Sequence, residues 1–169
     1  MNEYLPKTVE EVIYDLYKVD NIPSYSLGDA ISRHFKDRYR DIIDVVDDSS
    51  IEYGIINAAP YGIAYLLKLI FDSTARKHGG RLHLYNKRDL FIINFTWFSD
   101  KVFEESSIER LVSIADYSCA GLCMCDEKHY VEIALRITKT NVYKIYAIER
   151  NPLVTPMSLL ALLAPEELP

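Results

Sequence analysis

Apolar and polar residues follow two different periods along this chain. Downstream of residue 60 the apolar positions have helical spacing and form one broad face, made of Ile63, Leu66, Leu67, Ile70 and Phe71. Pro60 suits the first turn of a helix, and Gly79-Gly80 suits its end. The pattern therefore predicts a helix between these two signals.

Two more helices are predicted within the first 50 residues. Thr8 and Glu11 form a capping box for the first helix, which ends before Pro23. Ser26 begins the second helix, and a narrow apolar stripe follows it: Leu27, Ile31, Phe35, Tyr39, Ile42 and Val46. The residues from Asp47 to Ser50 are typical of a turn. A stripe this narrow packs on one neighbour, either the core of the same chain or its twin in a dimer.

Beyond Gly80 the period changes to two. Leu82 and Leu84 share one face of a strand, and the next strand repeats the pattern with Phe91, Ile93, Phe95 and Trp97. A turn from Asn86 to Asp89 joins the two strands into a hairpin.

A fourth helix and more strands complete the pattern. The helix is capped by Ser106 and carries the apolar stripe Ile108, Leu111, Val112 and Ala115. Strands follow at Gly121–Cys125, Val131–Ile137 and Val142–Ile148, with turns between them.

This order of elements predicts an α+β fold. We expect a two-layer α/β sandwich with helices on one face of a mixed or antiparallel sheet, and a helical N-terminal extension. The extension covers residues 1–50, the sandwich 51–150 and an apolar, proline-rich tail 151–169. The apolar piece from Met157 to Leu163 is too short to form a stable helix alone, so we expect it to dock on this chain or another.

Composition and charge narrow the function classes. The 169 residues are 49% hydrophobic and carry a net charge of −6, which argues against nucleic acid as the main partner. The apolar runs are too short to cross a bilayer, so we expect no membrane partner. Two basic clusters are interpreted as solvated surface at helix faces and helix ends: Arg33, Lys36, Arg38 and Arg40, and Arg76, Lys77, His78 and Arg81.

All three cysteines lie between positions 119 and 125, which leaves no distant pair for a stapling disulfide. We therefore expect a reducing, cytoplasmic setting. Cys119, Cys123, Cys125 and His129 together are a possible zinc ligand set. The same cysteines could instead fill core space as small apolar residues, or sense redox state.

The stretch from about Ile56 to Ile137 resembles the ATP-binding domain shared by histidine kinases, DNA gyrase and anti-sigma factor kinases. Residues 69–78 are similar to the N box of that family in hydrophobic spacing and in their basic end. Residues 114–122 and 134–137 are similar to its last helix and final strands. The resemblance implies the same sandwich fold and an ATP site beside the helix that begins near Pro60.

The sequence also departs from that family where the nucleotide would bind. The N-box Asn, which helps hold Mg²⁺ in the family, falls at Ser73, next to Asp72. The Asp-x-Gly-x-Gly turn is replaced by residues 96–100, and no glycine occurs between Gly80 and Gly121. A phosphate loop needs glycines so that its backbone can approach the anion. We also expect Trp97 and Phe98 to occupy nucleotide space.

Two functional hypotheses follow. The first is a non-catalytic regulatory or protein-interaction domain that has lost its nucleotide, needs no cofactor, and binds a protein partner or its own copy. Its expected contact residues are Trp97, Phe98, Leu159, Leu160 and Leu163. The alternative is a divergent phosphotransferase of the histidine kinase type that uses ATP and Mg²⁺.

In the phosphotransferase hypothesis the nucleotide would be held by Asp72, Ser73, Arg76 and Lys77. His34 would be the phospho-acceptor, although a solvent-exposed helix histidine is the simpler interpretation. The sequence leaves open whether the protein is an enzyme.

Overall fold

Strands from both halves of the chain meet in one mixed sheet in a computed structural model, which describes residues 14–49, 54–125 and 129–139. The seven strands are β1 (Asp20–Pro23), β2 (Ile43–Asp48), β3 (Gly54–Ala58), β4 (Gly80–Lys87), β5 (Leu90–Trp97), β6 (Gly121–Cys125) and β7 (Tyr130–Lys139). Their order is β1-β3-β7-β5-β4-β2, and β6 also pairs with β7. All described pairs are antiparallel except β2 with β4.

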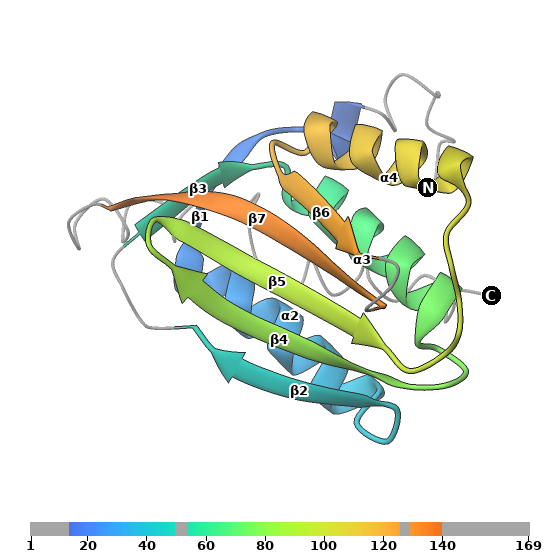
Figure 1. Cartoon of the computed structure of the whole chain (residues 1–169). Coiled ribbons are helices and arrows are strands. Elements are labelled where there is room, and N and C mark those ends of the chain that lie inside the picture. Colours follow the sequence, from blue (N-terminus) through green and yellow to red (C-terminus); the bar gives the residue numbers. More distant parts are fainter. Residues whose placement is uncertain (1–13, 50–53, 126–128, 140–169) are drawn as a thin grey trace, which may run out of the picture.

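Helices α2 (Ser24–Arg38) and α3 (Pro60–Thr74) cover one face of this sheet, and α4 (Glu105–Tyr117) packs beside α3 and β6 (Figure 1). No helix of the described residues covers the other face of the sheet, here called the open face (Figure 1). The predicted two-layer α/β sandwich is therefore confirmed. In the described part of the chain, no helix is long and apolar enough to span a membrane.

The core lies between the helices and the sheet. The apolar face predicted for α3 is buried, and so are the inward-pointing residues of β5 and β7 that follow period two. Aromatic rings link the layers: Phe71 of α3 lies 5.5 Å from Phe35 of α2 and 6.3 Å from Phe95 of β5 between ring centroids. The predicted hairpin between Leu82 and Trp97 is confirmed by the pairing of β4 with β5.

The predicted helix along the Leu27–Val46 stripe is confirmed only as far as Arg38. Helix α2 ends at Arg38, and Val46 lies in β2, which pairs in parallel with β4. Ile42 and Val46 keep the helical spacing of the stripe only by coincidence. The buried residue in this segment is Ile43, which lies on the inner face of a strand rather than of a helix. A dimer seam along a single helix from Leu27 to Val46 is therefore wrong.

Besides β2, two further strands were not predicted. The stretch that ends at Pro23, taken as a helix break, is β1, and it pairs with the unpredicted β3. Residues 14–49 thus contribute strands to the same sheet as the rest of the chain.

The fourth helix differs from its prediction in detail. It begins at Glu105, no side chain caps its N-terminus, and Val112 is exposed while Ile114 is buried. The predicted first helix, the strand at 142–148 and the tail at 151–169 lie wholly or mostly outside the described residues.

Candidate functional site

The C-terminal end of α3 carries the residues proposed for a nucleotide. The carboxylate of Asp72 accepts a hydrogen bond from Lys68 Nζ at 2.7 Å and from Arg76 Nη1 at 2.8 Å. These are the i, i+4 ion pairs that helical spacing allows. Ser73 and Lys77 are exposed beside this triad. The negative charge of Asp72 is therefore already neutralised by Lys68 of α3 and by Arg76 in the turn that follows it.

A short loop after β5 lies against this helix end. The Trp97 side chain is 1% exposed, packs edge-on against Phe103 at 5.6 Å, and donates its indole N–H to the Lys101 carbonyl at 3.0 Å. The Ser99 hydroxyl donates to the Thr74 carbonyl at 3.2 Å. The loop is thus closed on itself and tied to α3.

Phe98, the next residue, has the opposite environment. Its side chain is 63% exposed, while its backbone N–H donates to the Gly79 carbonyl at 3.0 Å. Gly79 has φ +85°, and a Cβ there would lie 2.9 Å from the Ile42 carbonyl oxygen. Glycine therefore permits the close approach of three segments that places Phe98 at the surface.

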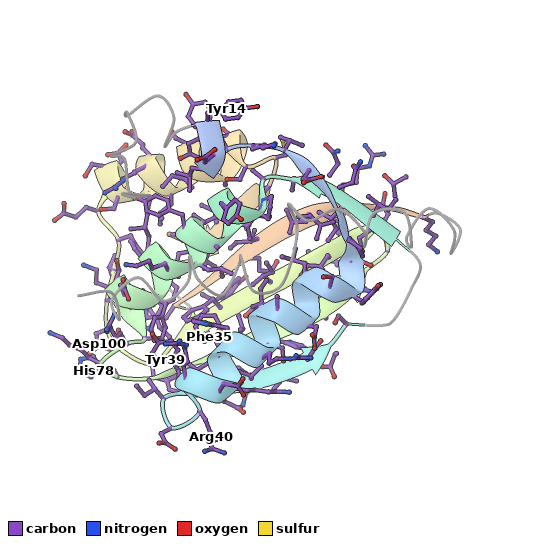
Figure 2. The ribbon with its side chains drawn as sticks, turned by 180° about the vertical axis from the view of Figure 1, so that it is seen from behind. Tyr14, Phe35, Tyr39, Arg40, His78 and Asp100 are labelled. Carbon is purple, nitrogen blue, oxygen red and sulfur yellow. The ribbon has the colours of Figure 1, made fainter. Side chains whose placement is uncertain are left out.

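A hollow of about 510 Å³ lies between the end of α3 and this loop. Its lining residues are Asp72, Ser73, Thr74, Lys77, His78, Phe98, Ser99, Asp100 and Lys101. Figure 2 shows His78 and Asp100 near one another at this end of the molecule. Trp97, which was expected to fill nucleotide space, is instead part of the core and does not line the hollow.

A second hollow of about 340 Å³ lies on the other side of Phe98. It is lined by Lys36, Arg40, Asp41, Ile42, Ile43, Asp44, Val45, Gly80 and Phe98. Of the basic residues in these hollows, Lys36, Arg40, Lys77 and His78 were interpreted from the sequence as solvated surface, and Lys101 belonged to neither cluster. The two basic clusters were visible in the sequence, but the loop that brings them to either side of one aromatic ring was not.

The prediction that Trp97 is an interface residue is wrong, because its side chain is buried in this chain's own core. Phe98 is exposed and its interface role stays a prediction, while Leu159, Leu160 and Leu163 lie outside the described residues. The interpretation of His34 as a solvent-exposed histidine is also wrong. Its side chain is 2% exposed and its ring lies 5.3 Å from that of Phe35, so the imidazole is not presented to a phosphoryl donor.

The cysteines do not fill the core as expected. Cys119, before β6, and Cys123, within it, are both exposed. Cys123 lies on the face of β6 opposite to Leu122 and Met124, which pack on the core. The side chain of Cys125 lies outside the described part of the structure. Among the side chains that are described, no group of three or more His, Cys, Asp or Glu residues could hold a metal ion. Zinc binding by this cluster stays a prediction.

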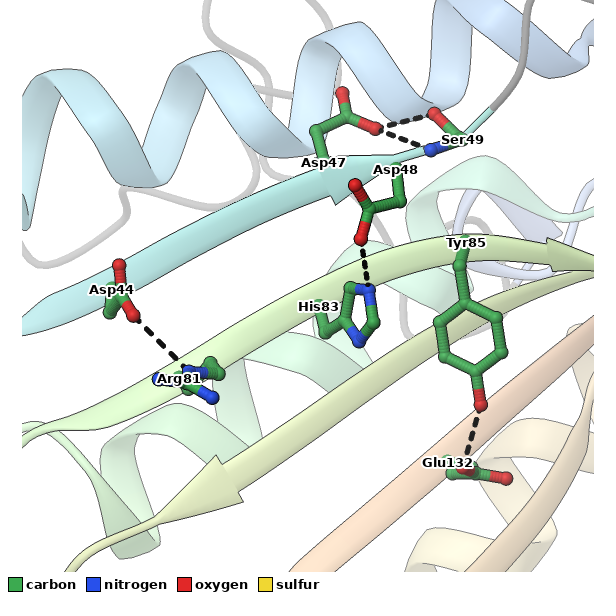
Figure 3. Close-up of polar contacts among 8 residues, drawn as sticks. All are labelled: Asp44, Asp47, Asp48, Ser49, Arg81, His83, Tyr85 and Glu132. Atoms are coloured by element: carbon green, nitrogen blue, oxygen red, sulfur yellow. Dashed lines mark hydrogen bonds and ion pairs between the residues drawn. The ribbon is translucent and has the colours of Figure 1, made fainter.

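The open face of the sheet carries a different polar group (Figure 3). Glu132 accepts hydrogen bonds from the Tyr85 hydroxyl at 2.9 Å and from Asn94 Nδ2 at 3.1 Å. His83 Nε2 lies 2.7 Å from the Asp48 carboxylate. Burial first, and the hydrogen bond to Glu132 second, raise the pKa of Tyr85 to about 12. These groups bind one another and leave no hollow for a ligand among the cavities described.

Comparison with known proteins places the fold. No protein-family model matches the sequence, and no curated protein matches it. Among solved structures, the histidine kinase AdeS of Acinetobacter baumannii is similar with a TM-score of 0.50 at 12% identity, over 79% of this chain and 77% of that one. The fold is histidine kinase-like.

Two more solved structures have lower scores. The ATP-binding domain of PrrB from Mycobacterium tuberculosis is 16% identical over 73% of this chain and 98% of that one, with a TM-score of 0.48. The cytoplasmic segment of histidine kinase QseC is 12% identical over 82% of this chain and 100% of that one, with a TM-score of 0.48. The similarity to AdeS confirms, at the level of the fold, the resemblance found in the sequence, and identities this low say nothing more about function.

Proposed function

We propose that this chain is a non-catalytic regulatory or protein-interaction domain on a histidine kinase-like fold, and that it does not bind nucleotide. The observation that carries the proposal is the loop after β5. In the family that the sequence resembles, a glycine-rich turn with an acidic residue follows this strand. Here the strand ends in the buried Trp97, whose indole closes the loop onto the Lys101 carbonyl.

The chemistry of this loop argues against a phosphate site. A phosphate loop binds through several backbone N–H groups that only glycines allow to converge. The N–H of Phe98 is already bonded to Gly79, and the Lys101 N–H lies 3.4 Å from Ser99 Oγ within the loop. Asp72, the nearest candidate for Mg²⁺, is bound by Lys68 and Arg76. Each of these groups would have to leave its present partner before it could serve a nucleotide.

Calorimetric titration with ADP and with a non-hydrolysable ATP analogue, each with and without Mg²⁺, tests the proposal. We expect no heat of binding at concentrations where a millimolar site would register. Micromolar binding that is lost in Asp72→Asn would contradict the proposal.

The phosphotransferase alternative keeps one observation in its favour. The hollow of about 510 Å³ lies beside α3 and is lined by Asp72, Ser73 and Lys77, three of the four residues expected to hold the nucleotide. Its volume is within the range of small-molecule sites. The same titration decides between the two, because the alternative requires binding that depends on Mg²⁺.

A further inference from the structure

The two hollows and the ring between them form one surface, here called the Phe98 surface, which comprises Phe98, Ile42 and the cations Lys36, Arg40, Lys77 and Lys101. Phe98 lines both hollows and is 63% exposed, and Ile42 is 37% exposed beside it. Apolar side chains exposed within a polar rim are typical of interaction sites.

The segments of this surface come from one end of the sheet. Gly80 at the start of β4 pairs with Trp97 at the end of β5 and with Ile43 at the start of β2. The Gly80 N–H donates to the Ile42 carbonyl at 3.2 Å, and Phe98 is bonded to Gly79. The backbone around Phe98 is therefore fixed before any partner arrives, which lowers the entropy cost of binding.

Charge gives the surface its selectivity. Within the described residues, Lys36, Arg40, Lys77 and Lys101 form no ion pair, whereas Arg33, Lys68 and Arg81 each bind an aspartate. The hollows also contain four aspartates. Two of these, Asp44 and Asp72, are already paired, which leaves Asp41 and Asp100 against four cations. A chain with a net charge of −6 thus has a locally positive surface.

We infer that the Phe98 surface binds an acidic peptide segment of a partner protein. Carboxylates of the segment would contact Lys36 and Arg40 on one side and Lys77 and Lys101 on the other, and an apolar side chain would pack on Phe98. This inference rests on the proposed function and names the partner class for it.

The arrangement favours a peptide over a polyphosphate. The cations lie in two hollows separated by an aromatic ring rather than converging on one point, and Asp72 and Asp100 stand in the larger hollow. An extended segment can alternate carboxylates and apolar side chains across that distance, whereas a compact anion would meet only one hollow. The net negative charge of the chain repels acidic partners elsewhere and so directs them to this end.

Fluorescence anisotropy with the full chain tests the inference. The probe is a labelled synthetic peptide in which Glu pairs alternate with Leu and Phe, and the control peptide has Lys in place of every Glu. We expect the acidic peptide to bind, the Lys peptide not to bind, and the affinity to fall as salt is added. Phe98→Ser should weaken binding by roughly tenfold or more, because it removes one aromatic contact.

Matched variants locate the binding. The double reversal Lys36→Glu with Arg40→Glu should abolish binding, while Lys87→Glu with Arg88→Glu, the same pair of charge reversals at the other end of β4, should not. Val112→Ser, an exposed apolar residue on α4, is the control for Phe98→Ser. Circular dichroism melts should be alike for all variants, because every substituted side chain is exposed.

Four results would overturn the inference. They are no binding of the acidic peptide, unchanged binding in Phe98→Ser, equal binding of a single-stranded DNA oligonucleotide, or a higher peptide affinity in the full-length variant Leu159→Ser with Leu160→Ser. The last result would mean that the chain's own tail takes the surface. Calorimetry with Mg²⁺-ADP on the same samples separates the two proposals. A heat of binding with Mg²⁺-ADP overturns the proposed function. If neither Mg²⁺-ADP nor the acidic peptide binds, only the peptide inference is overturned.

Discussion

The open face of the sheet and the Phe98 surface both carry aromatic and charged side chains, and they differ in how these side chains are paired. On the sheet face, Tyr85 and Asn94 bind Glu132, and His83 binds Asp48. At the Phe98 surface, four cations have no ionic partner among the described residues and an aromatic ring is exposed. Charge content alone therefore does not distinguish the two regions, whereas the pairing of the charges and the exposed apolar area beside them do.

The largest difference in stability is expected between alanine variants of two neighbouring residues, Trp97 and Phe98. Trp97→Ala removes a side chain that is 1% exposed and should lower the free energy of unfolding by about 3–5 kcal/mol. Phe98→Ala removes a side chain that is mostly solvated and should change it by no more than about 0.5 kcal/mol. Urea unfolding followed by circular dichroism measures both. Similar losses for the two variants would mean that Phe98 belongs to the core.

A smaller effect is expected at the turn that presents Phe98. In Gly79→Ala the new methyl group would meet the Ile42 carbonyl in a backbone with φ +85°, which should cost about 1–2 kcal/mol of stability. Gly121→Ala is the matched control, because a Cβ there would make only ordinary contacts at 3.8 Å. Equal urea midpoints for the two variants would show that the turn tolerates a side chain.

Some helices and strands could be predicted from the sequence, and others could not. The α3 helix and the β4–β5 hairpin were predicted because each has one clear period and strong end signals. β2 was missed because Ile42 and Val46 continue a helical spacing by chance, and only the parallel pairing with β4 makes the segment a strand. β1 was missed because four residues that end in a proline have no period of their own.

The site was predictable in composition and not in arrangement. Asp72 and Lys77 were named from the N-box resemblance, and the structure brings both to one hollow. The distinction between Trp97 and Phe98 depends on how a loop of a few residues closes, which no pattern of side chains specifies. His34 was misjudged because its burial depends on the position of Tyr39, whose ring lies 5.7 Å away after the helix has ended.

A pH experiment tests whether the polar contacts on the open face of the sheet stabilise the fold. Folding raises the pKa of Tyr85 to about 12 from 10.0, so its hydroxyl keeps its proton in the folded state after the unfolded chain has lost it. Stability that is present below pH 10 should therefore fall as the pH rises toward 12. Tyr85→Phe should remove that part of the fall in urea midpoints between these values. Parallel curves for the two proteins would contradict this.

The smallest effect is expected for the ion triad on α3. Asp72→Asn should lower the free energy of unfolding by less than about 1 kcal/mol, because all three side chains are partly exposed to solvent. The difference should shrink further when thermal melts are repeated at high salt. A loss several times larger would mean that the triad is a structural centre rather than a set of surface ion pairs.

We expect the Phe98 surface to bind an acidic peptide and not a nucleotide. The most direct test is to follow the backbone amide resonances of Lys77, His78 and Phe98 through Lys101 by NMR while each ligand is added in turn. We predict that the acidic peptide shifts these resonances and that Mg²⁺-ADP at millimolar concentration leaves them in place. Shifts with Mg²⁺-ADP and none with the peptide would contradict the account.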